Sequence, residues 1–452
     1  MGAKNSKFSV LIVAAGKGTR MKSMLPKSLQ PLAGQPIIAH ILQTAEKLSP
    51  SKVGIVVSEK NGLLEKQVRA NIKNWSLKNN IEFIVQYKAD GTASAVKCAS
   101  SFLKKHKKVL ILCGDTPLLE SNTLLNFKKD FCKHQPACSI LTFDNKNPHG
   151  YGRIVKDKKG NVLEIVEENH ATDEIKKINE VNSGVYIFDI PSLLSVLGKI
   201  KKKGKKQEYY LTDAIELLNK KTLAKHVIAS KLKQGEGASS TFKQAMGINS
   251  KKQLAEAEKI LRHKILDKLM ASGVTIVDPD STYIDANTKI GKDTIIQPNV
   301  YITNSKIGKN CIVKMGCYIV DSKVANKVEL GPYAHLRPQS DIRNNAKIGN
   351  FSEIKKSIIG EGSKVPHLSY VGDSVLGKKV NVGAGAITAN YDGKNKYKTI
   401  IGDNVFVGSN VNLIAPVKVN SGAKIGAGST ITEDVSKNSL AIARTRQIEK
   451  KP

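Results

Sequence analysis

The stretch VANKVELGPYAHLRPQSDIRNNAKIGNFSEI, residues 324–354, carries an aliphatic residue at every sixth position. These residues are Val324, Leu330, Leu336, Ile342, Ile348 and Ile354. Gly, Asn and Asp lie between them, where a chain with short strands must turn. A period of six predicts short strands that each place one aliphatic side chain inside, stacked as a parallel β-helix.

The same period extends in both directions along the chain. It begins at Ile284 and ends at Ile431, with four shorter steps of five residues. Three hexads therefore form one coil, and one side of the coil is sometimes a residue short. A long break between Val382 and Ile401 contains TANYDGKNKYKT, residues 388–399. We expect this segment to protrude as a loop, and protruding loops of a solenoid usually carry function.

The first half of the chain has a different pattern. Apolar runs at 8–14, 53–57, 81–86 and 109–113 predict buried strands, and the spacing after residues 36 and 121 predicts helices. Alternating strands and helices predict a Rossmann-like α/β domain with a mostly parallel, doubly wound sheet. Ligands of such sheets bind beyond the carboxyl ends of the strands, here after Ala14 and Cys113.

A long amphipathic segment separates these two patterns. Its apolar spacing over 251–271, followed by Gly273, predicts a connecting helix. We therefore expect one domain over 1–249, a linker helix over 250–273 and the β-helix over 274–452.

The net charge and the cysteine content indicate which partners and which location to expect. Of 452 residues, 72 are Lys or Arg and 39 are Asp or Glu, which gives a net charge of +33. The lysine clusters are scattered and lack interleaved aromatic residues, so we expect solvated surfaces and neither a nucleic-acid partner nor stable membrane association. Six cysteines without a CxxC pair, and no secretory signal, predict free thiols in the cytoplasm.

A glycine-rich turn follows the first predicted strand. It comprises Ala14, Ala15, Gly16, Lys17 and Gly18 and continues into Thr-Arg-Met, with Pro-Lys at 26–27. Glycines at such a turn let backbone amides approach phosphates. The alternative is an ordinary strand–helix turn, and the spacing does not match a Walker loop.

Further motifs between residues 86 and 213 accompany this turn. They include Gln86, GTA at 91–93, GD at 114–115, GYGRI at 150–154, Glu167, NSG at 182–184 and EYYLTD at 208–213. With the turn, they resemble the sugar-phosphate nucleotidyltransferases. The whole chain from Val10 to Arg444 resembles the bacterial family of bifunctional N-acetylglucosamine-1-phosphate uridyltransferases and glucosamine-1-phosphate N-acetyltransferases. That resemblance implies a left-handed β-helix, whereas the usual crossover rule favours the right hand.

The resemblance implies two reactions that make UDP-N-acetylglucosamine, a precursor of peptidoglycan and lipopolysaccharide. An acetyl group would pass from acetyl-CoA to glucosamine 1-phosphate. The product, N-acetylglucosamine 1-phosphate, would then attack the α-phosphate of UTP and release pyrophosphate. The second reaction requires positioning and charge neutralisation more than a strong base.

For uridylyl transfer, the resemblance assigns residues to each part of the substrates. Ala14, Ala15, Gly16, Lys17, Gly18 and Arg20 would hold the nucleotide and Lys27 would neutralise it; Gln86, Gly91 and Thr92 would bind uracil; Gly152, Glu167 and Asn182 would hold the sugar. Asp115 and Asn249 would bind Mg²⁺, which prefers oxygen ligands. Arg20 and Lys27 would be catalytic. The alternative for Asp115 is a helix N-cap.

For acetyl transfer, an amine needs a base of near-neutral pKa, and His suits this task. His367 stands in a stretch that matches the family's acetyltransferase signature. The resemblance makes it the base, with Asn390 also catalytic. Arg337, Lys355, Tyr370 and Asn381 would bind the sugar phosphate, and Ala384, Asn390, Tyr391, Ser409, Ala427 and Arg444 would bind acetyl-CoA. The alternative for Arg337 and Lys355 is a solvated coil face.

Assembly and three rival interpretations complete the sequence-based expectations. We expect a homotrimer formed through the β-helix, with acetyl sites between neighbours. A non-catalytic scaffold with the same two domains is disfavoured because the turn at 16–21, Lys27, Asp115 and His367 are all intact. A basic nucleic-acid binder would be retained on DNA in a salt-dependent way and show no turnover. A single-function nucleotidyltransferase would not need His367 or the loop at 388–399.

Overall fold

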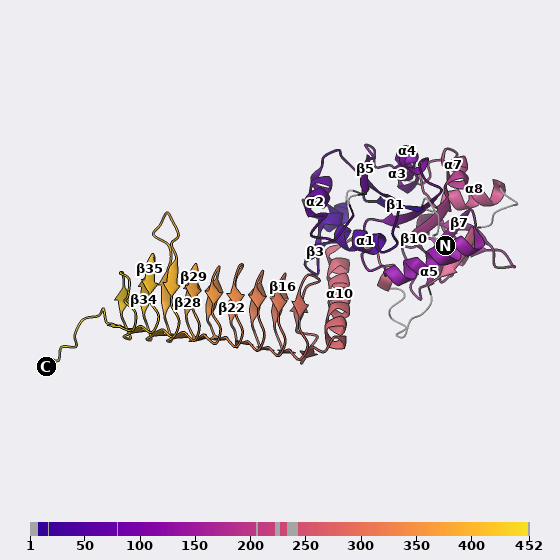
Figure 1. Ribbon diagram of the computed structural model, residues 1–452. Coiled ribbons are helices and arrows are strands. Elements are labelled where there is room, and N and C mark those ends of the chain that lie inside the picture. Colours follow the sequence, from indigo (N-terminus) through magenta and orange to yellow (C-terminus); the bar gives the residue numbers. More distant parts are fainter. Residues whose placement is uncertain are drawn as a thin grey trace, which may run out of the picture. The chain divides into compact units, whose positions relative to one another are not determined.

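The computed structural model describes residues 8–16, 18–78, 80–204, 207–221, 227–232 and 243–450. The chain divides into two compact units, Met1–Glu258 and Lys259–Pro452 (Figure 1). Among the described residues, none of the helices is both long and apolar enough to cross a membrane. Lys17, one of the expected nucleotide-binding residues, lies outside the described residues.

A seven-strand path forms the main sheet of the first unit, in the order β11-β7-β10-β6-β1-β4-β5. At its centre, β1 (Phe8–Val13) is parallel to β4 (Val53–Val57) and to β6 (Lys108–Cys113), and β4 is parallel to β5 (Ile81–Val85). The four predicted strands are thereby confirmed. The chain leaves β1 for β4 and β5 and returns to β6 on the other side, so the topological switch point lies at β1.

The other half of this sheet is mixed. Strand β10 (Glu180–Asp189) lies between β6 and β7 (Cys138–Asp144) and is antiparallel to both, while β11 (Val227–Lys231) is parallel to β7. The chain reaches β10 from the antiparallel hairpin of β8 (Arg153–Lys156) and β9 (Val162–Val166). The apolar runs predicted strands, but they carry no information on strand direction.

Helices cover this sheet and share its core. They are α1 (Ile37–Glu46), α2 (Leu63–Asn71), α3 (Thr92–Cys98), α4 (Ser100–Leu103), α5 (Ser121–His134), α6 (Asp173–Lys176), α7 (Ile190–Leu197) and α8 (Asp213–Lys221). Short elements are β2 (Pro31–Leu32), β3 (Gln35–Pro36) and the 3-10 turns η1 (Thr19–Met21), η2 (Lys27–Leu29) and η3 (Glu168–His170). Leu11 of β1 is fully buried in one cluster with Phe102, Leu193 and Ile215 of the helices.

The predicted connecting helix is α10 (Lys251–Ala271). It ends in a Schellman arrangement, in which the Gly273 amide donates to Met270 O at 3.0 Å and the Val274 amide to Leu269 O at 3.1 Å. The boundary between the two compact units, after Glu258, falls inside this helix. The domain limits at 249 and 273 stay predictions.

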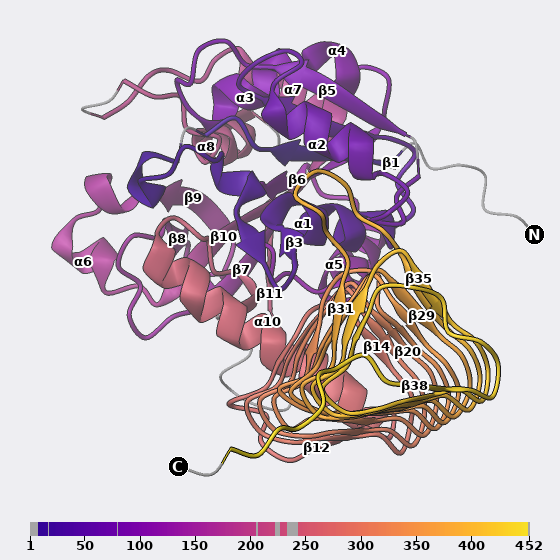
Figure 2. The same cartoon turned by 90° about the vertical axis from the view of Figure 1, so that its left-hand side faces the viewer.

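The second unit is the left-handed parallel β-helix of hexapeptide repeats, built from three sheets (Figure 2). The first sheet contains β12 (Thr275–Ile276), β15 (Ile295–Ile296), β18 (Ile312–Val313), β21 (Glu329–Leu330), β24 (Lys347–Asn350), β27 (Lys364–His367), β30 (Asn381–Val382), β33 (Phe406–Val407), β36 (Lys424–Ile425) and β38 (Leu440–Ala441).

The second sheet contains β13 (Tyr283–Ile284), β16 (Tyr301–Thr303), β19 (Tyr318–Val320), β22 (His335–Leu336), β25 (Glu353–Lys355), β28 (Tyr370–Gly372), β31 (Ile387–Ala389), β34 (Asn412–Ile414) and β37 (Thr430–Ile431). The third contains β14 (Lys289–Ile290), β17 (Lys306–Ile307), β20 (Lys323–Val324), β23 (Asp341–Ile342), β26 (Ile358–Ile359), β29 (Ser374–Leu376), β32 (Thr399–Ile401) and β35 (Val417–Val419). All pairs within the three sheets are parallel, so each coil stacks directly on the one before.

The aliphatic residues that set the period of six fill the inside of this coil. All of them are buried except Ile290, which is half-buried. In the first sheet, for example, Val313 pairs with Leu330 and Leu330 with Ile348. A single coil has no neighbour against which to bury its edges, so the stability of the coil depends on stacking.

The predicted loop protrudes between β31 and β32 (Figure 1). It folds back on itself, since Tyr391 and Lys396 form an antiparallel bridge. Its first and last predicted residues, Thr388 and Thr399, belong to the flanking strands.

Candidate functional sites

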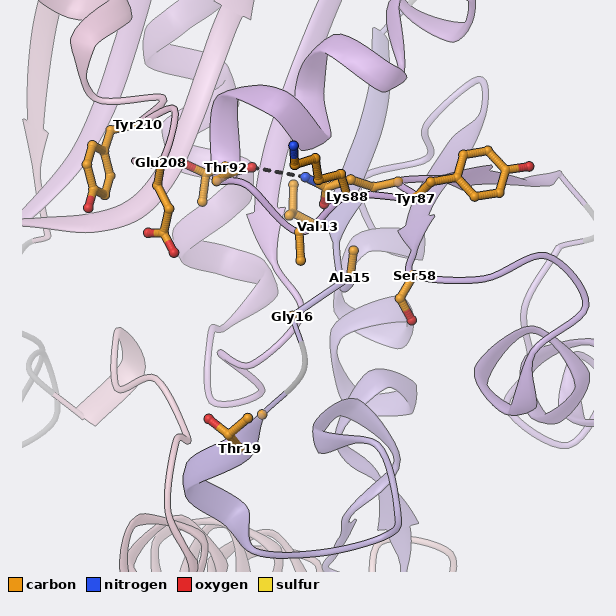
Figure 3. A pocket seen from close by; sticks show the side chains of 14 residues that line it. Val13, Ala15, Gly16, Thr19, Ser58, Tyr87, Lys88, Thr92, Glu208 and Tyr210 are labelled. Carbon is orange, nitrogen blue, oxygen red and sulfur yellow. Dashed lines mark hydrogen bonds between the residues drawn. The ribbon is translucent and has the colours of Figure 1, made fainter. Parts of the chain in front are cut away.

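The first unit holds a cavity of about 740 Å³ at the carboxyl end of β1 (Figure 3). Its lining comes from the turn after β1, the ends of β4 and β5, the start of α3 and the segment before α8. The lining residues are Val13, Ala15, Gly16, Gly18, Thr19, Ser58, Gln86, Tyr87, Lys88, Ala89, Gly91, Thr92, Glu208 and Tyr210. The cavity therefore lies at the switch point, where ligands of doubly wound sheets bind.

The glycine-rich turn needs its glycines for space and conformation. Gly16 faces open space, and a Cβ at Gly18 would lie 2.8 Å from the Cβ of Lys27. Gly18 also has a φ of +61°, which other residues rarely adopt. Arg20 follows in η1 with an exposed side chain, and Ala14 lies at the end of β1, where its amide donates to Val56 O at 2.9 Å.

One wall of the cavity contains the three residues expected to bind uracil. The buried Gln86 side chain donates from Nε2 to Gly91 O at 3.2 Å. Thr92 Oγ1 accepts from the Leu211 amide at 3.0 Å. Gly91 has a φ of +117°, and a Cβ there would lie 2.3 Å from Tyr209 O. The turn at 91–93 thus brings the segment containing Glu208 and Tyr210 to the cavity.

Lys27, Asp115 and Asn249 come together although they lie far apart in the sequence. Lys27 Nζ is 2.5 Å from Asp115 Oδ2 and donates to Asn249 Oδ1 at 3.1 Å. Both side chains of the ion pair are largely buried, with 15% and 18% exposed. The two residues expected to bind a metal thus already share one cation, the Lys27 ammonium.

The chemistry of these two ligands suits Mg²⁺. Both supply hard oxygen atoms, a carboxylate and an amide carbonyl, and Mg²⁺ is commonly held by one or two protein oxygens together with phosphate and water. Within the described parts of the chain, there is no cluster of three or more His, Cys, Asp or Glu that could hold a metal by itself. A nucleotide-assisted Mg²⁺ fits these residues better than a self-contained protein site.

Gly152, Glu167 and Asn182, expected to hold the sugar, form a second group. The Asn182 amide donates to Gly152 O at 2.9 Å, and a Cβ at Gly152 would lie 3.5 Å from Glu167 Oε2. Thr212 Oγ1 donates to Glu167 Oε1 at 3.0 Å, which leaves Oε2 for a ligand. Burial raises the pKa of the Glu167 carboxyl, and the charge of Asp213 adds to this effect.

Cys113 borders this second group. Its thiol donates to Gly184 O at 3.6 Å. Burial, reinforced by the charge of Asp115, raises the pKa of the Cys113 thiol to about 12. The thiol therefore stays protonated and acts as a packing group.

In the second unit, His367 lies at the corner where β27 ends. Its Nδ1 is 2.8 Å from Oδ1 of Asn350, which pairs with it across β24 and β27. An amide oxygen only accepts hydrogen bonds, so this contact fits the neutral tautomer in which Nδ1 carries the proton and Nε2 keeps its lone pair. The imidazole is exposed and thus open to a substrate.

Four of the six residues expected to bind acetyl-CoA, Ala384, Ser409, Ala427 and Arg444, lie in successive coils. Lys364 of β27 pairs with Asn381 of β30, so the strand that ends at His367 lies next to the strand that precedes Ala384. The Asn410 amide donates to Ala384 O, and the Gly428 amide to Ser409 O, both at 2.8 Å. Ala427 contacts Gly408, and Arg444 lies alongside Gly428. These contacts bring Ala384, Ser409, Ala427 and Arg444 into one row.

Three of the four expected sugar-phosphate residues lie on the second sheet or directly after one of its strands, namely Arg337, Lys355 and Tyr370, whereas Asn381 lies on β30 of the first sheet. Arg337 donates from Nη1 to Glu353 Oε1 at 2.8 Å, and Glu353 pairs with Tyr370 in the register. The adjacent Lys396 ammonium lowers the pKa of Lys355, and Arg337 contributes in the same direction. These cationic side chains, of which Arg337 is paired with Glu353, form a candidate site for an anion.

The loop brings its own residues to this group. Asn390, expected near the acyl transfer, is buried and donates from Nδ2 to Asp373 Oδ2 at 2.5 Å. Tyr391 is 60% exposed, and its hydroxyl donates to Gly393 O.

Several residues at the two sites were not among the expected ones. They are Ser58, Tyr87, Lys88, Glu208 and Tyr210 around the cavity and Lys396 in the second unit. Glu208 and Tyr210 belong to the EYYLTD motif, so a signal for them existed. Lys396 gave none, since lysines are abundant and its neighbours depend on how the loop folds back.

Comparisons with known proteins agree with the division of the chain into two units. A family model described as nucleotidyl transferase matches residues 9–233. A model described as bacterial transferase hexapeptide (six repeats) matches 287–320 and 398–433, and one described as GMPPB C-terminal domain matches 321–415.

Curated relatives match almost the whole chain. The bifunctional protein GlmU of Caldanaerobacter subterraneus subsp. tengcongensis is 45% identical and covers 97% of this chain and 96% of its own length. The protein of the same name from Listeria innocua is 43% identical over 98% and 97%, and that from Thermoanaerobacter pseudethanolicus is 46% identical over 97% and 96%.

Proposed function

The chain belongs to the family of the bifunctional protein GlmU, and from this membership we propose how its two sites work. It is a transferase that makes UDP-N-acetylglucosamine by acetyl transfer followed by uridylyl transfer, and so supplies peptidoglycan synthesis. The observation that carries this conclusion is the match of both units, in the same order, to relatives over 97% of the chain.

In acetyl transfer, His367 is the general base. The amine nitrogen of glucosamine 1-phosphate attacks the thioester carbonyl carbon of acetyl-CoA. His367 Nε2 accepts the amine proton as the C–N bond forms, and the C–S bond breaks to release CoA. Support comes from the hydrogen bond of Nδ1 to Asn350, which leaves Nε2 free to accept. The acetyl-CoA lies along the row of Ala384, Ser409, Ala427 and Arg444, with Asn390 and Tyr391 at its acyl end.

The phosphate of glucosamine 1-phosphate binds Arg337, Lys355 and Lys396, and Tyr370 and Asn381 complete the sugar site. Lys396 is the addition that the structure suggests. Three cations held close together repel one another, and a bound phosphate dianion relieves this repulsion.

Lys396→Ala should therefore raise the KM for glucosamine 1-phosphate by about 10- to 100-fold, the cost of a lost charge-assisted hydrogen bond. Lys394→Ala is the matched control, because Lys394 is an exposed lysine of the same loop. Steady-state kinetics of CoA release measure both variants. Equal effects of the two substitutions would contradict a specific role for Lys396.

In uridylyl transfer, the phosphate of N-acetylglucosamine 1-phosphate attacks the α-phosphorus of UTP, and the bond to pyrophosphate breaks. The turn containing Gly16, Lys17 and Gly18 holds the triphosphate, with Ala14 and Ala15 behind it, and Arg20 and Lys27 neutralise its charge. Gln86, Gly91 and Thr92 bind uracil. Glu167 Oε2 and the side chain of Asn182 accept and donate hydrogen bonds to the sugar beside Gly152. Asp115 and Asn249 would hold Mg²⁺, and the bound ion would neutralise further charge on the triphosphate.

Assembly and location belong to the same proposal. A trimer formed through residues 274–452 would place each acetyl site against a neighbour. The exposed rings of Tyr283, Tyr301 and Tyr318 on the second sheet support such an interface, since Tyr301 and Tyr318 stack at 4.8 Å and stay 38% and 46% exposed. We place the protein in the cytoplasm, without a nucleic-acid partner.

Light scattering should therefore give a mass three times the 49.1 kDa of one chain. A fully active monomer at assay concentration would contradict the shared acetyl site.

Two half-reaction assays test the function. With acetyl-CoA and glucosamine 1-phosphate, the protein should release free CoA thiol. With UTP, N-acetylglucosamine 1-phosphate and Mg²⁺, it should release pyrophosphate. A protein that performs only one of them would contradict the bifunctional assignment.

A further inference from the structure

Asp373 lies at the base of the protruding loop and contacts both of its ends. Its carboxylate accepts from Asn390 Nδ2 at 2.5 Å, at the start of the loop. Its backbone oxygen accepts from the Thr399 amide at 3.4 Å, at the end of the loop. Within the loop, the Tyr397 amide donates to Asn390 O at 2.9 Å, which ties the returning strand to the same point.

The position of Asp373 is fixed by the coil. It occupies the corner between the second and third sheets, where Asn304, Asp321, Gln339, Lys356 and Asp373 all have positive φ. The Asp373 amide donates to Lys355 O at 3.0 Å, one coil below. Only 6% of the residue is exposed, so the carboxylate is held between the coil and the loop.

The Asp373 carboxylate also interacts with two lysine side chains, Lys355 and Lys356. Lys356 Nζ is 3.6 Å from Asp373 Oδ1. The second carboxylate oxygen holds Asn390, and the Lys355 ammonium is attracted by the same carboxylate. A buried carboxylate with these partners is costly to leave unpaired, so it orients the amide that pairs with it.

We propose that Asp373 is a positioning residue for acetyl transfer, which orients the Asn390 side chain by holding its amide at the loop base. The carboxylate takes one N–H of the Asn390 amide, and this fixes the plane of the amide and the direction of its carbonyl oxygen. Asp373 itself does not touch the substrates. This inference rests on the proposed acetyl-transfer site, in which Asn390 lies at the acyl end of acetyl-CoA.

The test compares Asp373→Ala with a matched control, Asp321→Ala, in the full-length protein. Asp321 occupies the same corner three coils earlier, has a φ of +46° and also accepts a hydrogen bond from an Asn amide, that of Asn304. It lies far along the coil from the loop. We expect Asp373→Ala to lower kcat/KM of acetyl transfer by about 10- to 100-fold and Asp321→Ala to change it less than about twofold.

Uridylyl transfer by the same preparations reports on folding of the first unit, and the thermal unfolding midpoint reports on the β-helix. If Asp373→Ala does not fold, Asp373→Asn serves in its place, because it keeps an oxygen acceptor and the side-chain size. Asp373→Asn should lose about 3- to 10-fold, less than Asp373→Ala, since a neutral acceptor bonds the amide more weakly.

A double-mutant cycle separates positioning from general stability. If Asp373 acts through Asn390, the variant D373A/N390A should retain the acetyl-transfer rate of N390A within about twofold. The inference would be overturned if the losses of D373A and N390A multiplied in the double variant, or if D373A and D373N both kept the wild-type rate. In either case His367→Asn should still lower acetyl transfer by about 10²-fold or more. Lack of acetyl transfer in the wild-type protein would instead overturn the proposed function, and this inference with it.

Discussion

Replacing His367 with Ala is expected to lower kcat of acetyl transfer by about 10²–10⁴-fold, the usual worth of general-base assistance. The amine of glucosamine 1-phosphate must lose a proton as it attacks, and Nε2 of His367 is the acceptor that the hydrogen bond to Asn350 leaves open. The KM for acetyl-CoA should change little, since His367 is not among the residues proposed to bind acetyl-CoA. Release of CoA thiol measures both constants.

His367→Asn provides the matched comparison. Asn is similar in size and polar, but it does not take up a proton, so it should be no more active than Ala. Uridylyl transfer should remain at the wild-type rate in both variants. If His367→Asn retained most of its acetyl-transfer rate, Tyr370 or a bound water would have to be the base.

Asp115→Ala is expected to reduce uridylyl transfer by about 10³-fold or more while acetyl transfer stays near wild type. The carboxylate holds the Lys27 ammonium at 2.5 Å and supplies an oxygen to the proposed Mg²⁺, so its loss disturbs two sources of positive charge at the triphosphate. Release of pyrophosphate measures the first activity.

The comparison of activities decides the outcome for Asp115. Asp115 belongs to the first compact unit and His367 to the second. Loss of both activities in protein that remains folded would contradict two separate sites. An active Asp115→Ala variant would contradict the metal and Lys27 assignments.

Most of the fold could be predicted because its signals are local. In the β-helix, the aliphatic residue of each hexad marks the position that will be buried. The aliphatic residues from Ile284 to Ile431 that set the period do pack inside, and only Ile290 among them is half-buried. The first-unit strands were also apparent from apolar runs. The antiparallel direction of β10 was not, because direction depends on which strands the chain joins and not on the run itself.

The sites could be predicted only as far as motifs reach. The structure brings Lys27, Asp115 and Asn249 within hydrogen-bonding distance, although they stand 88 and 222 residues apart in the sequence. Ser58 and Tyr87 were not predicted. They follow β4 and β5, and they line the cavity only because of where these strands lie in the sheet, which the sequence pattern does not reveal. The proposed roles of Lys396 and Asp373 were not predicted either, because they depend on the fold of one irregular loop that has no sequence periodicity.

The most direct test of the central claim is a single mixture analysed by chromatography. It contains glucosamine 1-phosphate, acetyl-CoA, UTP and Mg²⁺, with wild-type protein, Asp115→Ala, His367→Asn or both variants together. We expect UDP-N-acetylglucosamine from the wild type and N-acetylglucosamine 1-phosphate alone from Asp115→Ala. His367→Asn should give neither product. The two variants combined should form UDP-N-acetylglucosamine again. No UDP-N-acetylglucosamine from the wild type, or none from the combined variants when each keeps its other activity, would contradict a chain with two independent transferase sites.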